Sequence, residues 1–251
     1  AEALGSFGDT SVVSALQAAA KTDPFDIVRK SAREAQYNVE LEAYLKTMTQ
    51  LALPKGEEEV QRAHQEVAAK RLGEVGWLLR HGGDAVRFEL SEGAIAALIE
   101  KLNKGLFVAL AEDPDWYVRV LAAEALGSFG DTSVVSALQA AAKTDPFDIV
   151  RKSAREAQYN VELEAYLKTM TQLALPKGEE EVQRAHQEVA AKRLGEVGWL
   201  LRHGGDAVRF ELSEGAIAAL IEKLNKGLFV ALAEDPDWYV RVLAAEALGS
   251  F

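Results

Sequence analysis

The chain has 251 residues and a mass of 27.2 kDa, of which 49% are hydrophobic and 27% charged, a composition typical of a folded globular protein. Its formal net charge of -11 argues against a nucleic-acid partner, because binding to phosphates requires a basic surface. The absence of cysteine excludes disulfides, thiolate metal sites and thiol nucleophiles. No apolar run reaches the roughly 18–20 residues of a membrane span, and no signal-like leader opens the sequence. We therefore expect a cytoplasmic protein without a membrane partner.

The sequence repeats itself with a period of 122 residues. The segment AEALGSF begins at Ala1, at Ala123 and again at Ala245, and residues 1–129 are identical to residues 123–251. Natural repeats drift, because most surface positions tolerate substitution at a cost of about half a kcal/mol or less. An identical repeat therefore indicates an engineered duplication, a window on a longer array, or a very recent natural duplication, and we favour the first two.

The repeat predicts three segments: a first unit at 1–122, an identical second unit at 123–244, and the start of a third copy at 245–251. Each boundary falls inside a predicted helix, which is unusual for a self-contained domain.

In chain order, using the second copy, the first predicted helix starts at Asp113, a favourable N-cap, with Pro114 at the first helical position. Its apolar residues follow helical spacing as far as Gly127, where the helix is expected to end. A short helix over 133–143 follows, capped by the Asp131–Thr132 pair.

The next predicted helix starts near Asp145 and meets no proline or glycine before Pro176. Its apolar side chains form two stripes offset by roughly 200° at 3.6 residues per turn. The helix either breaks near residues 158–160 or runs on and serves two cores on opposite sides, and we favour the continuous helix. The first stripe contains Phe147, Val150, Ala154, Ala157 and Val161, and the second Tyr159, Leu163, Tyr166, Met170 and Leu173.

A further helix is predicted from the acidic residues 179–181, which suit the positive end of the helix dipole, to His203. Its expected buried stripe includes Val182, Ala185, Val189, Leu194, Val197 and Leu200 or Leu201. His186 falls on this stripe and is expected to be a core or core-edge histidine. His203 opens the loop HGGD, where we expect it to end the helix rather than act as an acid or base.

After this loop, residues 207–212 alternate between apolar and polar and are expected to be extended. Ser213 is a predicted N-cap for a helix over 214–234, which contains Gly227. The count is five helices per unit, or six if Gly227 divides the last one, and no strand of consequence is expected.

The order Asp, Pro, Val, Arg, Ala recurs at Asp113 and Asp145, 32 residues apart. The pattern DPxxxVRxxAxxAL, followed by LGxxGD and a short apolar helix, resembles short HEAT-like repeats of bilin-lyase-type proteins and artificial HEAT scaffolds. The resemblance is specific over 113–152 in each copy and loose over 159–226. It implies an all-α, right-handed helical-repeat solenoid.

In that family the aspartate and arginine of the motif pair in a ladder between adjacent repeats. The resemblance implies the same role here for residues six positions apart at each helix start. These are Asp23 and Arg29, Asp113 and Arg119, Asp145 and Arg151, and Asp235 and Arg241.

No phosphate-binding, zinc-protease or nucleophile-elbow motif is present, so we expect no enzyme, no catalytic or metal residues and no cofactor. Trp116 and Trp238 stand beside the Asp-Pro motif and are expected to pack in the core or between repeats. These two tryptophans and the loop residues His81 and His203 are also possible contacts for a partner.

Three functions remain open. The leading interpretation is self-assembly, in which the tail at 235–251, the first helix of a pair, completes the head at 8–22 of another copy and gives a ring or a filament. The second is a monomeric scaffold that binds a protein or peptide. The third, implied by the resemblance alone, is a bilin-lyase-like protein that handles a chromophore, which the lack of cysteine disfavours.

Overall fold

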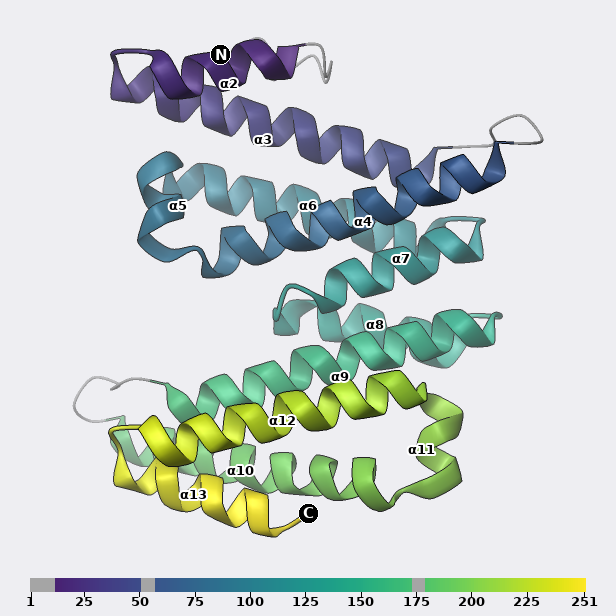
Figure 1. The fold of residues 1–251 in the computed structure, drawn as a ribbon, viewed down its shortest axis with the longest axis vertical. Coiled ribbons are helices and arrows are strands. Elements are labelled where there is room, and N and C mark those ends of the chain that lie inside the picture. The colour runs from purple at the N-terminus through teal and green to yellow at the C-terminus, as the bar shows by residue number, and fades with distance from the viewer. Residues whose placement is uncertain (1–11, 51–56, 173–178) are drawn as a thin grey trace. The chain divides into compact units, whose positions relative to one another are not determined.

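The computed structural model describes residues 12–50, 57–172 and 179–251, and in these ranges all regular elements are helical. The chain divides into two compact units, unit 1 at Ala1–Phe129 and unit 2 at Gly130–Phe251. This division keeps whole the helix that contains Ala123, the start of the second sequence copy (Figure 1).

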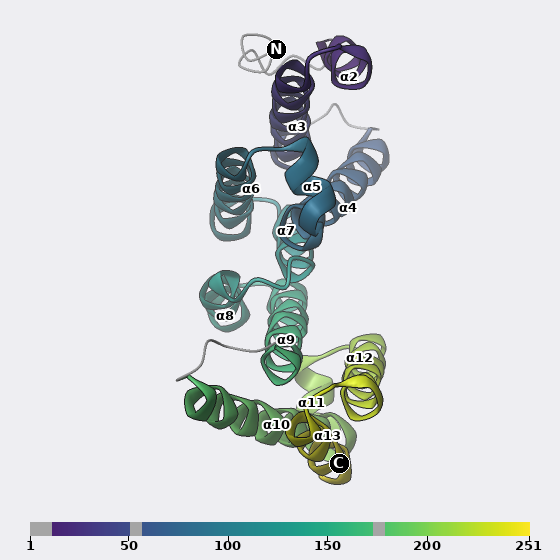
Figure 2. The ribbon, with the colours of Figure 1, turned by 90° about the vertical axis from the view of Figure 1, so that its left-hand side faces the viewer.

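Within the described ranges, each unit contains the same six α-helices in the same order, and unit 2 also has a 3-10 turn at Thr132–Val134. Unit 1 has α2 (Val13–Thr22), α3 (Asp26–Thr49), α4 (Glu58–His81), α5 (Gly83–Glu89), α6 (Glu92–Glu112) and α7 (Trp116–Gly127). Unit 2 has α8 (Val135–Thr144), α9 (Asp148–Thr171), α10 (Glu180–His203), α11 (Gly205–Glu211), α12 (Glu214–Glu234) and α13 (Trp238–Gly249). Within unit 2, α8 packs on α9, α9 on α10 and α12 on α13, and α10 also lies against α13 (Figure 2).

The aspartate of each Asp-Pro pair does not cap the helix that follows it. α7 begins at Trp116, and its N-cap is Asp115, whose carboxylate accepts from the Tyr117 N–H. Asp113 instead accepts from the Asp115 N–H at 2.9 Å and so forms the turn before the helix. The predicted start at Asp113 was therefore two residues early, because the Asp-Pro pair belongs to the turn.

The long helix α9 is continuous, as predicted, and serves two sets of neighbours. Its first half buries Val150, Ala154 and Val161, and the helix packs against α8. Its second half places Leu163 and Met170 in the large hydrophobic cluster with α10, α12 and α13. A single helix thus joins two parts of unit 2, since its apolar stripe changes side partway along.

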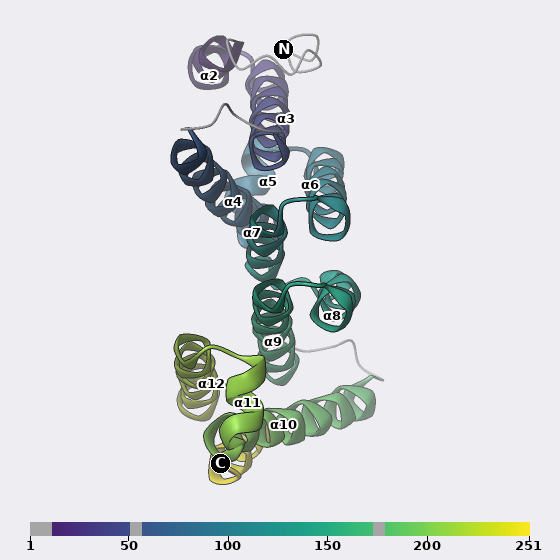
Figure 3. The same ribbon diagram turned by 90° about the vertical axis from the view of Figure 1, so that its right-hand side faces the viewer.

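Residues 207–212, predicted as extended, lie mainly in the short helix α11, which connects α10 to α12 (Figure 3). Gly205 has a φ of +53°, which glycine adopts without steric cost and which lets the chain leave α10 and start a new helix at once. Val208 and Leu212 are buried whereas Phe210 is exposed. This is the four-residue spacing of a helix rather than the alternation of a strand. The sixth helix is therefore α5 in unit 1 and α11 in unit 2, and Gly227 does not divide α12.

Helix α10 buries a face that overlaps the predicted stripe only in part, because Leu194 and Leu201 are buried as predicted and the other predicted residues are not. Its buried residues are mostly small: Gln187, Ala190, Ala191, Leu194, Gly195, Gly198 and Leu201. Val182, Val189 and Leu200 are exposed, and so is His186, which is not a core residue. Because glycine and alanine let helices approach closely, α10 packs against α13 through this face, whereas Val182, Val189 and Leu200 remain outside.

Candidate functional site

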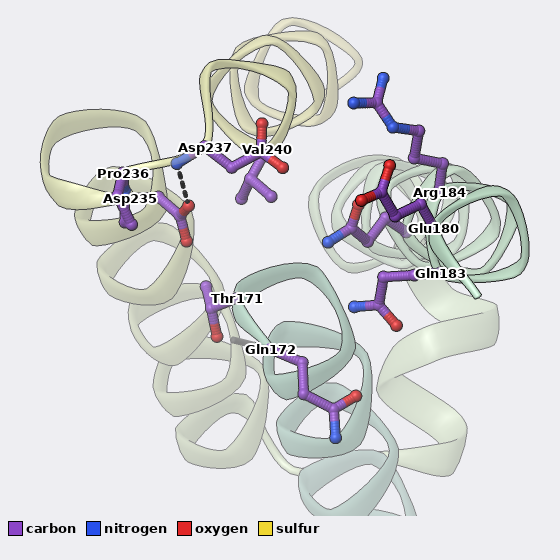
Figure 4. Close-up of a pocket in the computed structure, with 10 residues that line it drawn as sticks. Thr171, Gln172, Glu180, Gln183, Arg184, Asp235, Pro236, Asp237 and Val240 are labelled. Atoms are coloured by element: carbon purple, nitrogen blue, oxygen red, sulfur yellow. Dashed lines mark hydrogen bonds between the residues drawn. The ribbon is translucent and has the colours of Figure 1, made fainter. Parts of the chain in front are cut away.

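A pocket of about 390 Å³ lies in unit 2 between the end of α9, the start of α10 and the turn from α12 to α13 (Figure 4). Its wall combines three carboxylates with amides, a hydroxyl and one guanidinium. It is lined by Thr171, Gln172, Glu180, Gln183, Arg184, Gln187, Asp235, Pro236, Asp237 and Val240.

The two aspartates of the pocket are held by backbone hydrogen bonds at the start of α13. The Asp237 N–H donates to Asp235 Oδ1 at 2.9 Å, and the Tyr239 N–H donates to Asp237 Oδ1 at 2.9 Å. Arg241 Nη1 donates to the carbonyl oxygen of Asp235 at 2.7 Å. These contacts hold the turn that forms this part of the pocket wall. In unit 1, burial raises the pKa of Asp113, the counterpart of Asp235.

Gln187 is the most deeply buried polar side chain of the pocket, at 3% exposure. Its Nε2 donates to the Met170 carbonyl oxygen at 3.3 Å. Its Oε1 has no hydrogen-bond partner among the described residues, and the same holds for Gln65, its counterpart in unit 1. Buried polar atoms usually have a partner in the protein or in an ordered water.

Arg184 supplies the positive charge of the pocket wall but is directed toward α13. Its guanidinium carbon lies 5.1 Å from the centre of the Tyr239 ring, a cation–π contact. The Tyr239 hydroxyl donates to Glu188 on α10, which raises the pKa of Tyr239. In unit 1, burial and the hydrogen bond to Glu66 raise the pKa of Tyr117 to about 12.

An apolar strip runs along the outside of α10, and we call it the α10 outer surface. It consists of Val182, Val189, Trp199 and Leu200, all exposed, with Trp199 at 53%. The Trp199 ring stacks on His203, with 5.2 Å between ring centres. Unit 1 exposes the same four positions of α4, namely Val60, Val67, Trp77 and Leu78.

A second exposed apolar surface lies on α12 and α13, and we call it the α12–α13 surface. It consists of Phe229, Leu232, Trp238 and Val242, with Trp238 at 59% exposure. Trp238 is therefore not a core residue in unit 2, whereas Trp116 is half-buried. The residues that α12 and α13 bury, including Leu228, Ala231 and Leu243, belong to the large cluster of unit 2.

The arginines of the repeated motif bond to their own helix starts. Arg29, Arg119, Arg151 and Arg241 each donate from Nη1 to the carbonyl oxygen six residues earlier at 2.7 Å. The aspartates at these positions are Asp23, Asp113, Asp145 and Asp235, and they accept through Oδ1 from the N–H two residues later. The ladder between adjacent repeats stays a prediction.

The loop histidines lie at helix ends, as predicted. α10 ends at His203, with Gly204 as its C-cap, and His81 has the same place in α4. The Nδ1 atom of each lies 3.1 Å from the carbonyl oxygen of the tryptophan four residues earlier. Their contact with a partner stays a prediction, as does that of Trp116 and Trp238.

Two further observations concern metal-binding groups and membrane spans. In these ranges, no group of three or more histidine, cysteine, aspartate or glutamate side chains could hold a metal ion. Among the helices that the structure describes, none is long and apolar enough to cross a membrane.

Residues 77–159 match the family of HEAT repeats. The fold is an all-α helical-repeat solenoid. HEAT repeats are generally non-enzymatic and commonly mediate protein interactions, and the match supports a helical-repeat scaffold of the protein-binding kind. A comparison with curated proteins found no match.

Proposed function

We propose that this helical-repeat protein, an array of identical units of engineered origin, binds further copies of itself head to tail. The observation that carries the proposal is the α12–α13 surface, on which Phe229, Leu232, Trp238 and Val242 are exposed. In helical-repeat proteins each repeat contacts only its neighbours, and a terminal repeat needs a polar outer face to remain soluble. The apolar α12–α13 surface therefore resembles a surface between repeats.

A second copy of the chain is the occupant that the sequence supports. Residues 107–120, the counterpart of the surface in unit 1, precede another unit along the chain and are identical to residues 229–242. A further unit of the same sequence, brought by another molecule, would then meet the same side chains. Burial of four large apolar side chains would favour this contact by the hydrophobic effect.

The opposite surface of such a contact is at the start of the described chain. Phe25 and Ile27, at the start of α3, are exposed at 67% and 71%. They adjoin α2, which forms the main part of the predicted head. The first residues of that head, 8–11, lie outside the described residues. Because the two surfaces differ, the contact is heterologous and gives a closed ring or an open filament.

Light scattering coupled to size exclusion, over a concentration series, tests this proposal. We expect a native mass that is a multiple of 27.2 kDa, constant for a ring and increasing with concentration for a filament. The double variant Phe229→Glu/Val242→Glu should be a monomer, because burying two carboxylates without partners is unfavourable. Val230→Glu is the matched control, since Val230 is exposed on the same helix but points to a different side.

A steady mass of 27.2 kDa at every concentration would overturn self-association, as would equal masses for the double variant and the control. The second candidate, a monomeric scaffold for another protein, would then be the better account. It is favoured by the α10 outer surface, because both units expose the same four apolar positions there. An amphipathic helix in a groove is a common partner for such a surface.

A further inference from the structure

We propose that Trp238 at the start of α13 packs on Phe25 at the start of α3 of the next copy, and that this aromatic pair sets the register of the head-to-tail contact. The pairing rests on the self-association proposed above and names the side chains that meet in it. Both rings are exposed, so both are accessible to a partner.

Identical residues of α7 and α13 differ in exposure. Val120 of α7 is 7% exposed, whereas Val242, its counterpart in α13, is 42% exposed. In the same sense, Trp116 is half-buried and Trp238 is exposed. Since the two helices have the same sequence, the difference comes from the surroundings of each helix. α13 therefore presents to a partner a face that the same sequence buries in unit 1.

The start of α3 differs from the start of α9 in the same way. Phe25 is 67% exposed, whereas Phe147, its counterpart, is 46% exposed. Ile27 is likewise more exposed than Ile149. Two patches thus show extra exposure, one near the tail of the chain and one near its head, as expected for a surface and its partner surface on another copy.

Other exposed apolar residues do not show this difference. Val108 and Val230 are exposed to nearly the same extent, and so are Phe88 and Phe210. The extra exposure therefore belongs to particular faces and is not a general difference between the two units.

The sequence period predicts which helix start follows which. One Asp-Pro motif begins at Asp113 and the next at Asp145, 32 residues later. Asp235 is the counterpart of Asp113, and Asp23 is the counterpart of Asp145. A second copy that continues the period therefore brings its motif at Asp23 next after the motif at Asp235, and repeats of this kind contact their immediate neighbours.

The two rings occupy corresponding places in these motifs. Trp238 is the first residue of α13, and Phe25 is the N-cap of α3. Equivalent helices of successive repeats stack with their starts side by side, so rings at the two starts meet. Trp238 already packs edge-on against Tyr239, with 5.7 Å between ring centres, and a second ring adds aromatic packing to the burial of apolar surface.

Two blocked variants limit the assembly to a single contact. Ile27→Glu blocks the head and leaves the tail intact, whereas Val242→Glu blocks the tail and leaves the head intact, because a carboxylate buried without a partner is unfavourable. Each variant alone should be a monomer, and their mixture should give a complex of twice 27.2 kDa. Absence of a complex in the mixture would overturn both the proposed function and the ring pair.

A double-mutant cycle in this mixture tests the ring pair itself. Trp238→Ala is placed in the head-blocked chain and Phe25→Ala in the tail-blocked chain, singly and together, and isothermal titration gives each Kd. We expect both changes to weaken the complex, with a coupling of about two- to tenfold between them. Additive effects would overturn the pairing of Trp238 with Phe25 and would leave head-to-tail association in place.

Trp199→Ala in the head-blocked chain is the matched control, because Trp199 and its counterpart Trp77 are exposed to a similar extent. It should change the Kd by less than about twofold. A loss of affinity equal to that of Trp238→Ala would place the contact on the α10 outer surface and would overturn the pairing. All the substituted side chains are exposed, so each variant should keep the helical circular dichroism of the wild type.

Discussion

Gly198 of α10 lies directly against the ring of Phe251, so that a Cβ at Gly198 would come within 2.5 Å of the ring atoms Cδ1 and Cγ. The same relationship joins Gly76 and Phe129 in unit 1, where a Cβ at Gly76 would lie 2.1 Å from Cε1 of the Phe129 ring. A side chain at either glycine is therefore incompatible with the present ring position. This close approach explains why the buried face of α10 is rich in glycine and alanine.

Gly76→Ala should destabilise unit 1, because the added methyl group collides with the fully buried ring of Phe129. Overpacking of this kind costs about 1–3 kcal/mol, and urea denaturation followed by circular dichroism would measure it. Gly215→Ala is the control, since a Cβ at Gly215 meets nothing within 4 Å. That variant should be unchanged or stabilised by about 0.5 kcal/mol, because alanine favours the helix. Equal stabilities for the two variants would contradict the close packing.

Tyr117 should ionise at a higher pH than an ordinary tyrosine, because its pKa is raised to about 12. The folded-state pKa is raised above the unfolded value of about 10, so the contribution to stability is complete below pH 10 and is lost as the pH rises through 12. Subtracting the ultraviolet titration of Tyr117→Phe from that of the wild type isolates this residue. Glu66→Gln should lower the pKa only in part, because burial, the largest cause, remains. A difference curve centred near pH 10 would contradict the expectation.

Arg241→Gln should weaken the joint between α12 and α13. Arg241 Nη1 bonds the carbonyl oxygens of Asp235 and Pro236 at 2.7 and 3.1 Å, and the Asp235 carbonyl is at the negative end of α12. Loss of a charged hydrogen bond costs about 1.5–3 kcal/mol in buried settings, and about 1–2 kcal/mol is expected here because Arg241 is half-buried. Thermal denaturation would show the loss. Arg193→Gln, which breaks only an exposed pair with Glu196, should change stability by less than about 0.5 kcal/mol.

Ser213→Ala should destabilise α12 by removing its N-cap. The Ser213 Oγ accepts from the Ala216 N–H at 3.1 Å, and such caps contribute about 1 kcal/mol. Hydrogen exchange of the first-turn amides of α12 should become faster than in the wild type. Ser136→Ala, at an exposed position of α8, is the comparison, and it should leave exchange in α12 unaffected. Unchanged exchange in Ser213→Ala would show that this cap does not limit fraying of the helix.

The helices and several of their boundaries were predictable because they depend on neighbours in the sequence. Ser213 caps the helix predicted for it, and α9 runs continuously through its change of apolar stripe. Asp131 instead caps a 3-10 turn at Thr132–Val134 that precedes α8. These features depend on capping chemistry and on the absence of proline and glycine, which act within a few residues. The candidate site was only partly predictable. Asp235 and Arg241 stood out through the repeated motif, whereas nothing in the sequence around Gln187 indicated a buried oxygen without a donor.

The sequence by itself determined that the chain is helical and that its two halves repeat without a substitution, since both follow from residue order alone. Only the tertiary structure decided which face of α10 is buried. Helical spacing allowed both the face of Val182 and Val189 and the face of Ala190 and Gly198. The second is buried because Phe251 and Ser250 of the last turn after α13 fit against glycines there. Such close contact between segments distant in the sequence depends on the shape of both partners, and no local pattern encodes it.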